Sequence, residues 1–181
     1  MNSRHWLSQA ERLDLALYAA VARTNIPALD RAMYRVSDAA NYSRLWIAAA
    51  ALLAIVGGAK GRRAAVDGLL SIAVTATVVN VGVKPLGRRR RPERGPLLAR
   101  HVRMPRSRSF PSGHAASAFA FATGVGITEP QVAVGLRALA AVVAYSRVHT
   151  GVHFPGDVAI GSLLGVSLAQ MTTRARERRR S

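Results

Sequence analysis

The sequence predicts an all-α protein, an integral membrane helical bundle of about five transmembrane helices with an N-terminal amphipathic surface helix. Half of the 181 residues are hydrophobic, yet 26 Lys and Arg against 9 Asp and Glu give a net charge of +17. The apolar and basic residues occupy separate stretches of the chain. Because arginine is unfavourable inside lipid and favourable at the interface, this separation is typical of membrane spans joined by basic loops.

The N-terminal part predicts surface helices. Within residues 8–23, Leu13 and Leu17 recur at helical spacing while charged residues fall on the other faces, a pattern typical of an amphipathic helix lying on a membrane. A second short helix is expected after Pro27. No recognisable chemistry is expected in residues 1–44.

The first two predicted spans differ in length. Residues 45–58 are nearly all apolar but short, so they reach the roughly 20 residues that a bilayer requires only if 39–44 extend them. Residues 64–83 are a better span, with small polar side chains that can hydrogen-bond between helices. The second span delivers Lys84 to the membrane surface.

Three further spans are expected after a basic loop, over residues 112–127, 131–145 and 158–171. Pro111 followed by Ser112 favours a helix start, with Ser112 at the cap position. Such a start aims backbone N–H groups at an anion.

The chain is expected to form a single domain over 1–181, with surface helices in 1–44, a motif region at 84–157 and a basic tail at 174–181. The short, alanine-rich spans leave a soluble helical bundle as an alternative. The charge alone allows nucleic-acid binding, but the sequence lacks the interleaved aromatics of a stacking platform, so no nucleic-acid partner is expected. The absence of cysteine excludes disulfides and thiolate zinc sites.

Three short motifs carry candidate chemistry: K-P-L-G-R-R-R-R-P at 84–92, P-S-G-H at 111–114, and S-R-V-H-T-G-V-H-F-P-G-D at 146–157. Phosphoryl transfer needs positive charge on the phosphate oxygens, which Lys84, Arg91 and Arg147 can supply. Backbone N–H groups around Ser112 and Gly113 can add neutral donors.

Two histidines have complementary roles in this interpretation. Asp157 lies four residues after His153, across a turn that can bring its carboxylate to the ring and leave the other ring nitrogen free to attack phosphorus. His153 is therefore the expected nucleophile. His114 is then expected to protonate the leaving group and to deprotonate the attacking water.

Other residues near the motifs are given structural interpretations. Arg88, Arg89 and Arg90 fall between the fixed positions of the first motif and are interpreted as a solvated or headgroup-facing run. His149 and His153 have the i, i+4 spacing of a metal pair, but Gly151 disfavours a regular helix there and no third ligand beyond an aspartate is apparent. We expect no metal and no cofactor.

The chain resembles the type 2 phosphatidic acid phosphatase superfamily, which includes bacterial acid phosphatases and vanadium haloperoxidases. The signature K-x6-R-P, P-S-G-H and S-R-x5-H-x3-D matches at every fixed position, within residues 84–157. The matching residues are Lys84, Arg91, Pro92, Pro111, Ser112, Gly113, His114, Ser146, Arg147, His153 and Asp157. The resemblance implies an all-helical fold, a covalent phosphohistidine, no metal requirement and, in membrane members, a lipid phosphate substrate.

The expected protein is a multi-pass lipid phosphatase of the cell membrane with its site on the extracytoplasmic face. Candidate substrates are phosphatidic acid, phosphatidylglycerol phosphate and polyprenyl phosphates, diphosphates or phosphosugars. The motifs contact only the phosphate that these lipids share, so they specify neither the lipid nor the oligomeric state. The alternatives are a vanadate-dependent haloperoxidase and a non-specific acid phosphatase.

Overall fold

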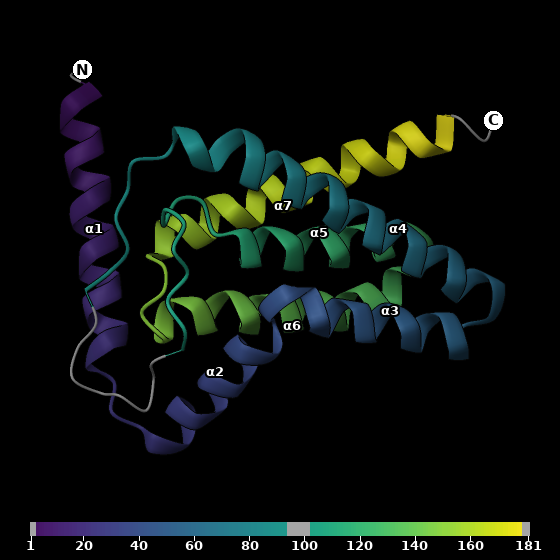
Figure 1. The fold of residues 1–181 in the computed structure, drawn as a ribbon, viewed down its shortest axis with the longest axis horizontal. Helices are drawn as coiled ribbons and strands as arrows, with labels where there is room; N and C mark the ends of the chain where they lie inside the picture. The colour runs from purple at the N-terminus through teal and green to yellow at the C-terminus, as the bar shows by residue number, and fades with distance from the viewer. Residues whose placement is uncertain (1–2, 94–101, 179–181) are drawn as a thin grey trace.

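A computed structural model describes residues 3–93 and 102–178, and within these residues the chain is entirely helical. Figure 1 shows a bundle of helices running side by side, with another helix lying across one end of the bundle. The elements are α1 (Ser3–Arg23), α2 (Pro27–Ala39), η1 (Asn41–Ser43), α3 (Arg44–Val56), α4 (Gly58–Thr77), η2 (Val78–Val83), η3 (Lys84–Leu86), α5 (Gly113–Thr128), α6 (Pro130–His149) and α7 (Pro155–Arg178). His101 and the end of the basic tail (179–181) lie outside the described residues.

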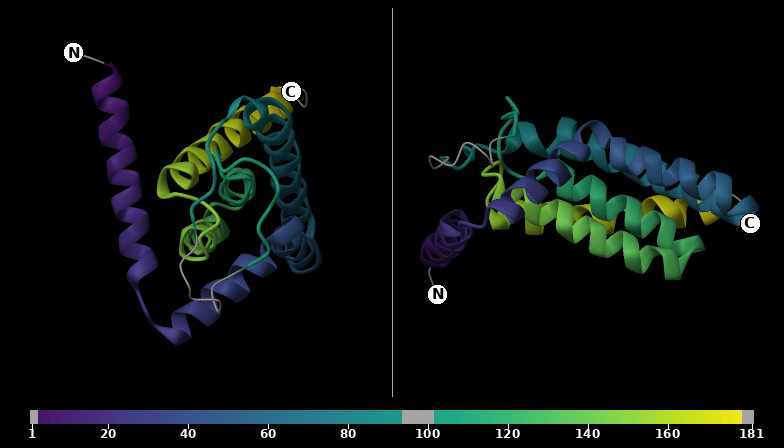
Figure 2. Two further views of the ribbon diagram at one scale, coloured as in Figure 1. Left: turned by 60° about the vertical axis from the view of Figure 1, so that its left-hand side comes forward. Right: turned by 90° about the horizontal axis from the view of Figure 1, so that it is seen from below.

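Helix α1 is the predicted amphipathic helix, and it starts earlier than the pattern indicated. It crosses the bundle axes instead of joining them, as two further views show (Figure 2). Leu13, Leu15 and Leu17 are 61%, 46% and 48% exposed, so no protein surface covers this apolar face. An apolar face without a protein partner fits a helix that lies in the membrane interface.

The first span is not extended as predicted. Tyr42 and Ser43 adopt positive φ angles of 55° and 57°, which break the helix between α2 and α3. The two helices are bent by 65°. Residues 39–44 therefore turn the chain onto a new axis and do not lengthen α3, because left-handed residues cannot continue a right-handed helix.

By length and apolar composition, two helical segments among the described residues can cross a membrane, Gly58–Leu86 and Pro130–His149. A third is obtained if the bent pair of α2 and α3 counts as one span. Helices α5 and α7 lie beside them in the bundle, as expected for five spans, although α5 has only 16 residues.

The bundle interior is built from small residues, and the large apolar side chains face outward. Helix α5 packs against α4, α6 and α7, and Ala115, Ala118 and Ala120 on it are fully buried. The outside carries exposed side chains such as Ile55 at 78% and Leu163 at 62%. A small-residue interior with an apolar exterior is the pattern of a bundle surrounded by lipid, and it argues against the soluble alternative.

Glycines bring α7 against α5. A Cβ atom on Gly161 would clash with the Ser112 carbonyl oxygen, and one on Gly165 would clash with the Ala116 carbonyl oxygen. The glycines are one helical turn apart, so they form a smooth strip along which the two backbones approach closely. This contact fixes the start of α5 beside the start of α7.

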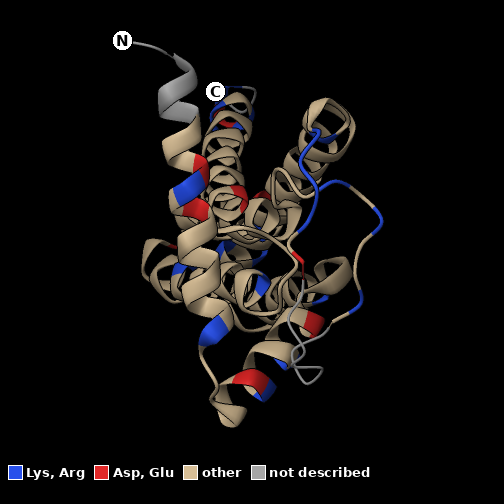
Figure 3. Ribbon diagram, turned by 90° about the vertical axis from the view of Figure 1, so that its left-hand side faces the viewer, with Lys and Arg blue, Asp and Glu red and all other residues tan. Residues whose placement is uncertain are grey.

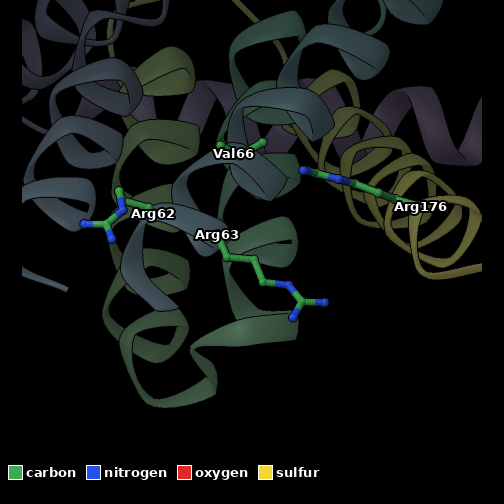
Figure 4. A pocket seen from close by; sticks show the side chains of 4 residues that line it. All are labelled: Arg62, Arg63, Val66 and Arg176. Carbon is green, nitrogen blue, oxygen red and sulfur yellow. The ribbon is translucent and has the colours of Figure 1, made fainter. Parts of the chain in front are cut away.

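The two ends of the bundle differ in their residues. All three sequence motifs meet at the end that α1 crosses, where basic loop residues gather (Figure 3). At the other end, Arg62, Arg63 and Arg176 surround Val66 in a hollow of about 600 Å³ (Figure 4). Asp67 pairs with Arg176 there at 2.6 Å.

Candidate active site

The eight predicted site residues come from six segments and converge on one end of the bundle. Lys84 begins η3 at the end of the α4 continuation, and Arg91 lies in the following loop. The others are Ser112, Gly113 and His114 at the start of α5, Arg147 in the last turn of α6, His153 in the α6–α7 loop and Asp157 in the first turn of α7. A cavity of about 180 Å³ is lined by Lys84, Gly113 and His114, together with Asn80 and Ser117.

His153 and Asp157 form the pair that their spacing predicts. Asp157 Oδ2 lies 3.6 Å from His153 Nδ1, and both residues are buried. The same oxygen accepts hydrogen bonds from the Ser109 hydroxyl at 2.5 Å and from the Phe154 N–H at 3.0 Å. The carboxylate is therefore held from several sides, so its direction relative to the ring is fixed.

The neighbours of His153 define its tautomer. Arg91 Nη1 lies 3.3 Å from His153 Nε2, and a guanidinium can only donate, so Nε2 accepts and the proton sits on Nδ1 toward Asp157. Burial, together with the charges of Arg91 and Arg147, lowers the pKa of His153 to about 4 although Asp157 opposes the shift. The imidazole is neutral at pH 7, and its Nε2 lone pair faces the cationic side of the site.

Arg91 also organises the loop that precedes α5. Its Nε donates to the Ser107 carbonyl at 2.9 Å, and its Nη1 donates to the Val152 carbonyl at 2.8 Å. Lys84 Nζ contacts the Ser107 hydroxyl at 3.4 Å. Two of the predicted phosphate ligands are thus fixed to one loop beside His153.

Arg147 is buried and is held by α2. Its Nη1 donates to the Ser37 hydroxyl at 2.6 Å and to the Ser37 carbonyl at 3.0 Å. The positive charge of Arg147 lies close enough to Lys84 and His153 to lower the pKa of both groups. A buried guanidinium is stable only with hydrogen-bond acceptors such as those of Ser37, so α2 is required to keep this charge at the site.

His114 lies at the N-terminus of α5, where the chain is capped as predicted. The Ser112 side chain accepts a hydrogen bond from the Ala115 N–H at 3.4 Å and is the N-cap. His114 Nε2 lies 3.2 Å from Asn41 Oδ1, in η1. A Cβ atom on Gly113 would lie 3.4 Å from Lys84 Nζ, so the backbone at Gly113 lies close to the lysine charge.

Several site residues were missed by sequence reasoning. Ser109 touches Asp157, Ser37 holds Arg147, Asn41 contacts His114, and Asp14 pairs with Arg89. The expectation that residues 1–44 carry no chemistry is therefore wrong, since three of these residues come from that part. Only Ser109, close to the P-S-G-H motif, had a sequence signal that could have been followed.

The interpretation of the arginine run is wrong for Arg89. This residue forms ion pairs with Asp14 at 2.5 Å and with Asp157 at 3.1 Å, and it stacks over Phe154 at 4.0 Å from the ring centre. The Arg89 guanidinium therefore pairs with two carboxylates and an aromatic face of the protein instead of facing solvent or lipid headgroups.

His149 does not join His153 as a metal pair. Its Nε2 lies 2.8 Å from Asp30 Oδ1, a buried contact that ties α6 to α2. Among the described residues, no group of three or more His, Cys, Asp and Glu side chains is arranged to hold a metal ion.

Comparisons with known proteins agree with this geometry. Residues 64–181 match the family model described as the PAP2 superfamily. The chain is 40% identical over 100 residues to decaprenylphosphoryl-5-phosphoribose phosphatase of Mycobacterium tuberculosis, a match covering 53% of this chain and 52% of that protein. The protein of the same name from Mycolicibacterium smegmatis is 35% identical over 162 residues, 86% of this chain and 84% of its own length. The chain thus spans about half the length of the M. tuberculosis relative that it matches.

Two crystal structures share the architecture. LpxE of Aquifex aeolicus superposes with a TM-score of 0.70 at 27% identity, covering 90% of this chain and 95% of that one. The PAP2-type phosphatidylglycerolphosphate phosphatase of Bacillus subtilis gives a TM-score of 0.71 at 26% identity, covering 94% and 87%. Because the family match covers more than half of the chain and the bundle agrees with these structures, the protein belongs to the PAP2 superfamily.

Proposed function

We propose that this protein is a membrane lipid phosphatase that removes a phosphate group from a polyprenyl or related lipid through a phosphohistidine intermediate. One observation carries the proposal: the neutral His153 presents its Nε2 lone pair beside Arg91 while Asp157 faces Nδ1. A nucleophile fixed in one tautomer among cationic groups is suited to attack an anionic phosphate.

The first chemical step forms a bond between His153 Nε2 and phosphorus. The bond from phosphorus to the lipid oxygen breaks, and its electron pair passes to that oxygen, which takes a proton from His114, whose protonated form is favoured by the bound anionic phosphate. Lys84, Arg91 and Arg147 stabilise the charge on the three equatorial oxygens, and the N–H groups at Ser112 and Gly113 add neutral donors.

The second step returns the enzyme to its starting state. His114, now neutral, removes a proton from a water molecule that attacks phosphorus. The nitrogen–phosphorus bond breaks, its electron pair returns to His153, and inorganic phosphate leaves. Both steps are balanced by groups of the protein and one water molecule, and the proposed mechanism uses no metal or other cofactor.

The relatives favour a prenyl phosphosugar among the candidate substrates. Both mycobacterial proteins are named as phosphatases of decaprenylphosphoryl-5-phosphoribose. The cavity beside His114 is lined by Asn80, Ser117 and Tyr42, whose polar groups can receive the hydroxyls of a sugar headgroup. The lipid tail would stay in the bilayer while the phosphate reaches Lys84.

The site is proposed to face away from the cytoplasm. Arginines flank the membrane helices at the opposite end, including Arg62, Arg63 and Arg176, as expected for cytoplasmic flanks. The chain has no cysteine, so single cysteines can report the orientation. In intact cells, an impermeant thiol reagent should label Arg106→Cys and not Arg62→Cys, and the reverse result would invert the orientation.

Residues 1–181 are proposed to work as one unit, because α1 and α2 both contribute contacts to the site. Phosphate release in chelator is the decisive test, with purified wild type and His153→Ala in detergent. The panel contains phosphatidic acid, phosphatidylglycerol phosphate, polyprenyl mono- and diphosphates, and a prenyl phosphoribose. Release by wild type alone, fastest on the phosphosugar lipid, is expected.

Full activity of His153→Ala would refute the covalent mechanism. Activity that is lost in chelator and restored by a divalent ion would refute the metal-free chemistry. Equal rates on water-soluble phosphate esters would favour the acid phosphatase alternative, and halide oxidation with added vanadate would favour the haloperoxidase.

A further inference from the structure

Helix α1 is attached to the active-site end through Asp14. Both oxygens of this carboxylate are used: Oδ2 pairs with Arg89 Nη2 at 2.5 Å, and Oδ1 accepts the Gly156 N–H at 2.6 Å. Asp14 is only 8% exposed although α1 lies on the surface. Its partners lie next to the catalytic pair, since Gly156 immediately precedes Asp157.

Arg89 continues the connection to the catalytic carboxylate. Its Nη1 donates to Asp157 Oδ1 at 3.1 Å, on the side of the carboxylate away from the oxygen that faces His153. The Phe154 ring covers the guanidinium at 4.0 Å, and Tyr18 of α1 packs edge-on against that ring. The guanidinium is therefore held between two carboxylates and one aromatic face.

We propose that Asp14 and Arg89 form a positioning pair that holds Asp157 against the nucleophile and makes the membrane-surface helix α1 part of the catalytic apparatus. This inference rests on the proposed function. The chain of contacts runs Asp14, Arg89, Asp157, His153, with each link given by a measured distance. Neither Asp14 nor Arg89 touches the phosphate site itself, so both act through Asp157.

Helix α1 also carries exposed apolar side chains next to Asp14. Leu13 and Leu17 flank Asp14 on α1 and line, with Phe110 and Ile160, an apolar hollow of about 710 Å³ between α1 and α7. Asp14 and Arg89 line the same hollow, so we expect α1 to be held both by its exposed leucines in lipid and by the ion pair with Arg89. Loss of the ion pair should leave α1 bound to lipid but release Arg89.

Because the charges alternate along these contacts, the proposal predicts the direction in which each variant shifts the titration midpoint of His153. The charged groups around His153 are Arg91, Arg147 and Asp157, with Arg89 and Asp14 behind the aspartate. Neutralising Asp14 makes the surroundings of His153 more positive and should lower its titration midpoint. Neutralising Arg89 should raise it. Simple loosening of the site would admit water and move both variants in one direction, toward the ordinary value.

The experiment compares Asp14→Asn, Arg89→Gln, the double variant and Glu11→Gln in lipid nanodiscs. Glu11 is a matched control, because it is an exposed carboxylate one turn away on α1 and makes no ion pair among the described residues. Each single variant should lose about tenfold in kcat with little change in KM, as expected for a charge-assisted hydrogen bond that is only partly lost. The loss of kcat in the double variant should be smaller than the product of the losses in the two single variants.

Nitrogen-15 histidine NMR gives the second readout, the direction of the His153 midpoint. Opposite shifts in Asp14→Asn and Arg89→Gln support the positioning pair. Equal behaviour of Asp14→Asn and Glu11→Gln, or shifts of one sign, would overturn it. If Asp14→Asn does not fold, an Arg89→Gln protein that keeps the wild-type kcat, or whose midpoint is not raised, would by itself overturn the inference. If His153→Ala is inactive while Asp14→Asn keeps the wild-type kcat, the proposed function stands and only this inference is refuted.

Discussion

Replacing Asp157 by asparagine tests how the nucleophile is oriented. The neighbours of this carboxylate all present hydrogens: Arg89 at Oδ1, and Ser109, the Phe154 N–H and the His153 ring at Oδ2. The amide of Asp157→Asn places an NH2 group against one of these two sets of donors. In either orientation the NH2 group of the amide faces hydrogen-bond donors and cannot accept from them, whereas both oxygens of the carboxylate can.

The consequence falls on the tautomer of His153. With the NH2 group at the Oδ2 position, Nδ1 must become the acceptor and the proton moves to Nε2, where it occupies the lone pair that attacks phosphorus. With the NH2 group at the Oδ1 position, the ion pair with Arg89 is lost. A wrong histidine tautomer in a comparable Asp–His arrangement lowers kcat by about 10⁴. Loss of one charge-assisted hydrogen bond, about 1.5–3 kcal/mol, sets the lower limit at roughly tenfold.

We therefore expect Asp157→Asn to lower kcat by about 10³- to 10⁴-fold, measured as phosphate release from the lipid substrate in detergent. Asp30→Asn is the matched control, because Asp30 pairs with a buried histidine, His149, that lies outside the cavity. The control should lose far less activity. A folded Asp157→Asn protein that keeps kcat within tenfold of wild type would refute the role of the carboxylate in fixing the tautomer.

Three further predictions concern the other groups of the site. His114→Ala should lose more activity on lipid phosphates than on activated aryl phosphates, because only poor leaving groups need its proton; equal losses would contradict this role. Ser37→Ala removes a 2.6 Å hydrogen bond from Arg147 and should raise KM by about three- to tenfold, whereas an unchanged KM would mean that Arg147 is positioned by other contacts. The lowered pKa of His153, about 4, predicts an NMR titration midpoint near 4, and one near 6.5 would refute it. Because the unfolded chain binds this proton below about 6.5 and the folded protein only below about 4, the Tm should fall as pH drops through this window.

Sequence reasoning reached the helical fold and the convergence of the three motifs because both depend on local patterns. Helical spacing and apolar runs indicated the helices, and alternation of the spans across the membrane required the motifs to share one end. The cap at Ser112 and the pair of His153 with Asp157 are separated by at most four residues from their partners. Such contacts are set by the geometry of one turn or one loop, which a sequence displays directly.

The break between α2 and α3 could not be predicted from such a local pattern in the sequence. Residues 39–44 continue an apolar stretch, yet Tyr42 and Ser43 adopt left-handed backbone angles there. Neither residue type signals such angles, since glycine and asparagine are the usual choices. The break places Asn41 beside His114, so a change of direction in the backbone supplies a contact to the site.

The sequence by itself determined the class of the protein, the order of its helices and the residues that we propose to bind a phosphate. Only the tertiary structure decided which partners hold those residues: Asp14 on Arg89, Ser37 on Arg147 and Asn41 on His114. These pairs are separated by more than 70 positions, and many charged or polar side chains could fill each role. Their choice depends on how α1 and α2 pack across the end of the bundle. Pairs that are set by such packing have no characteristic spacing in the sequence, so they could not be predicted from it.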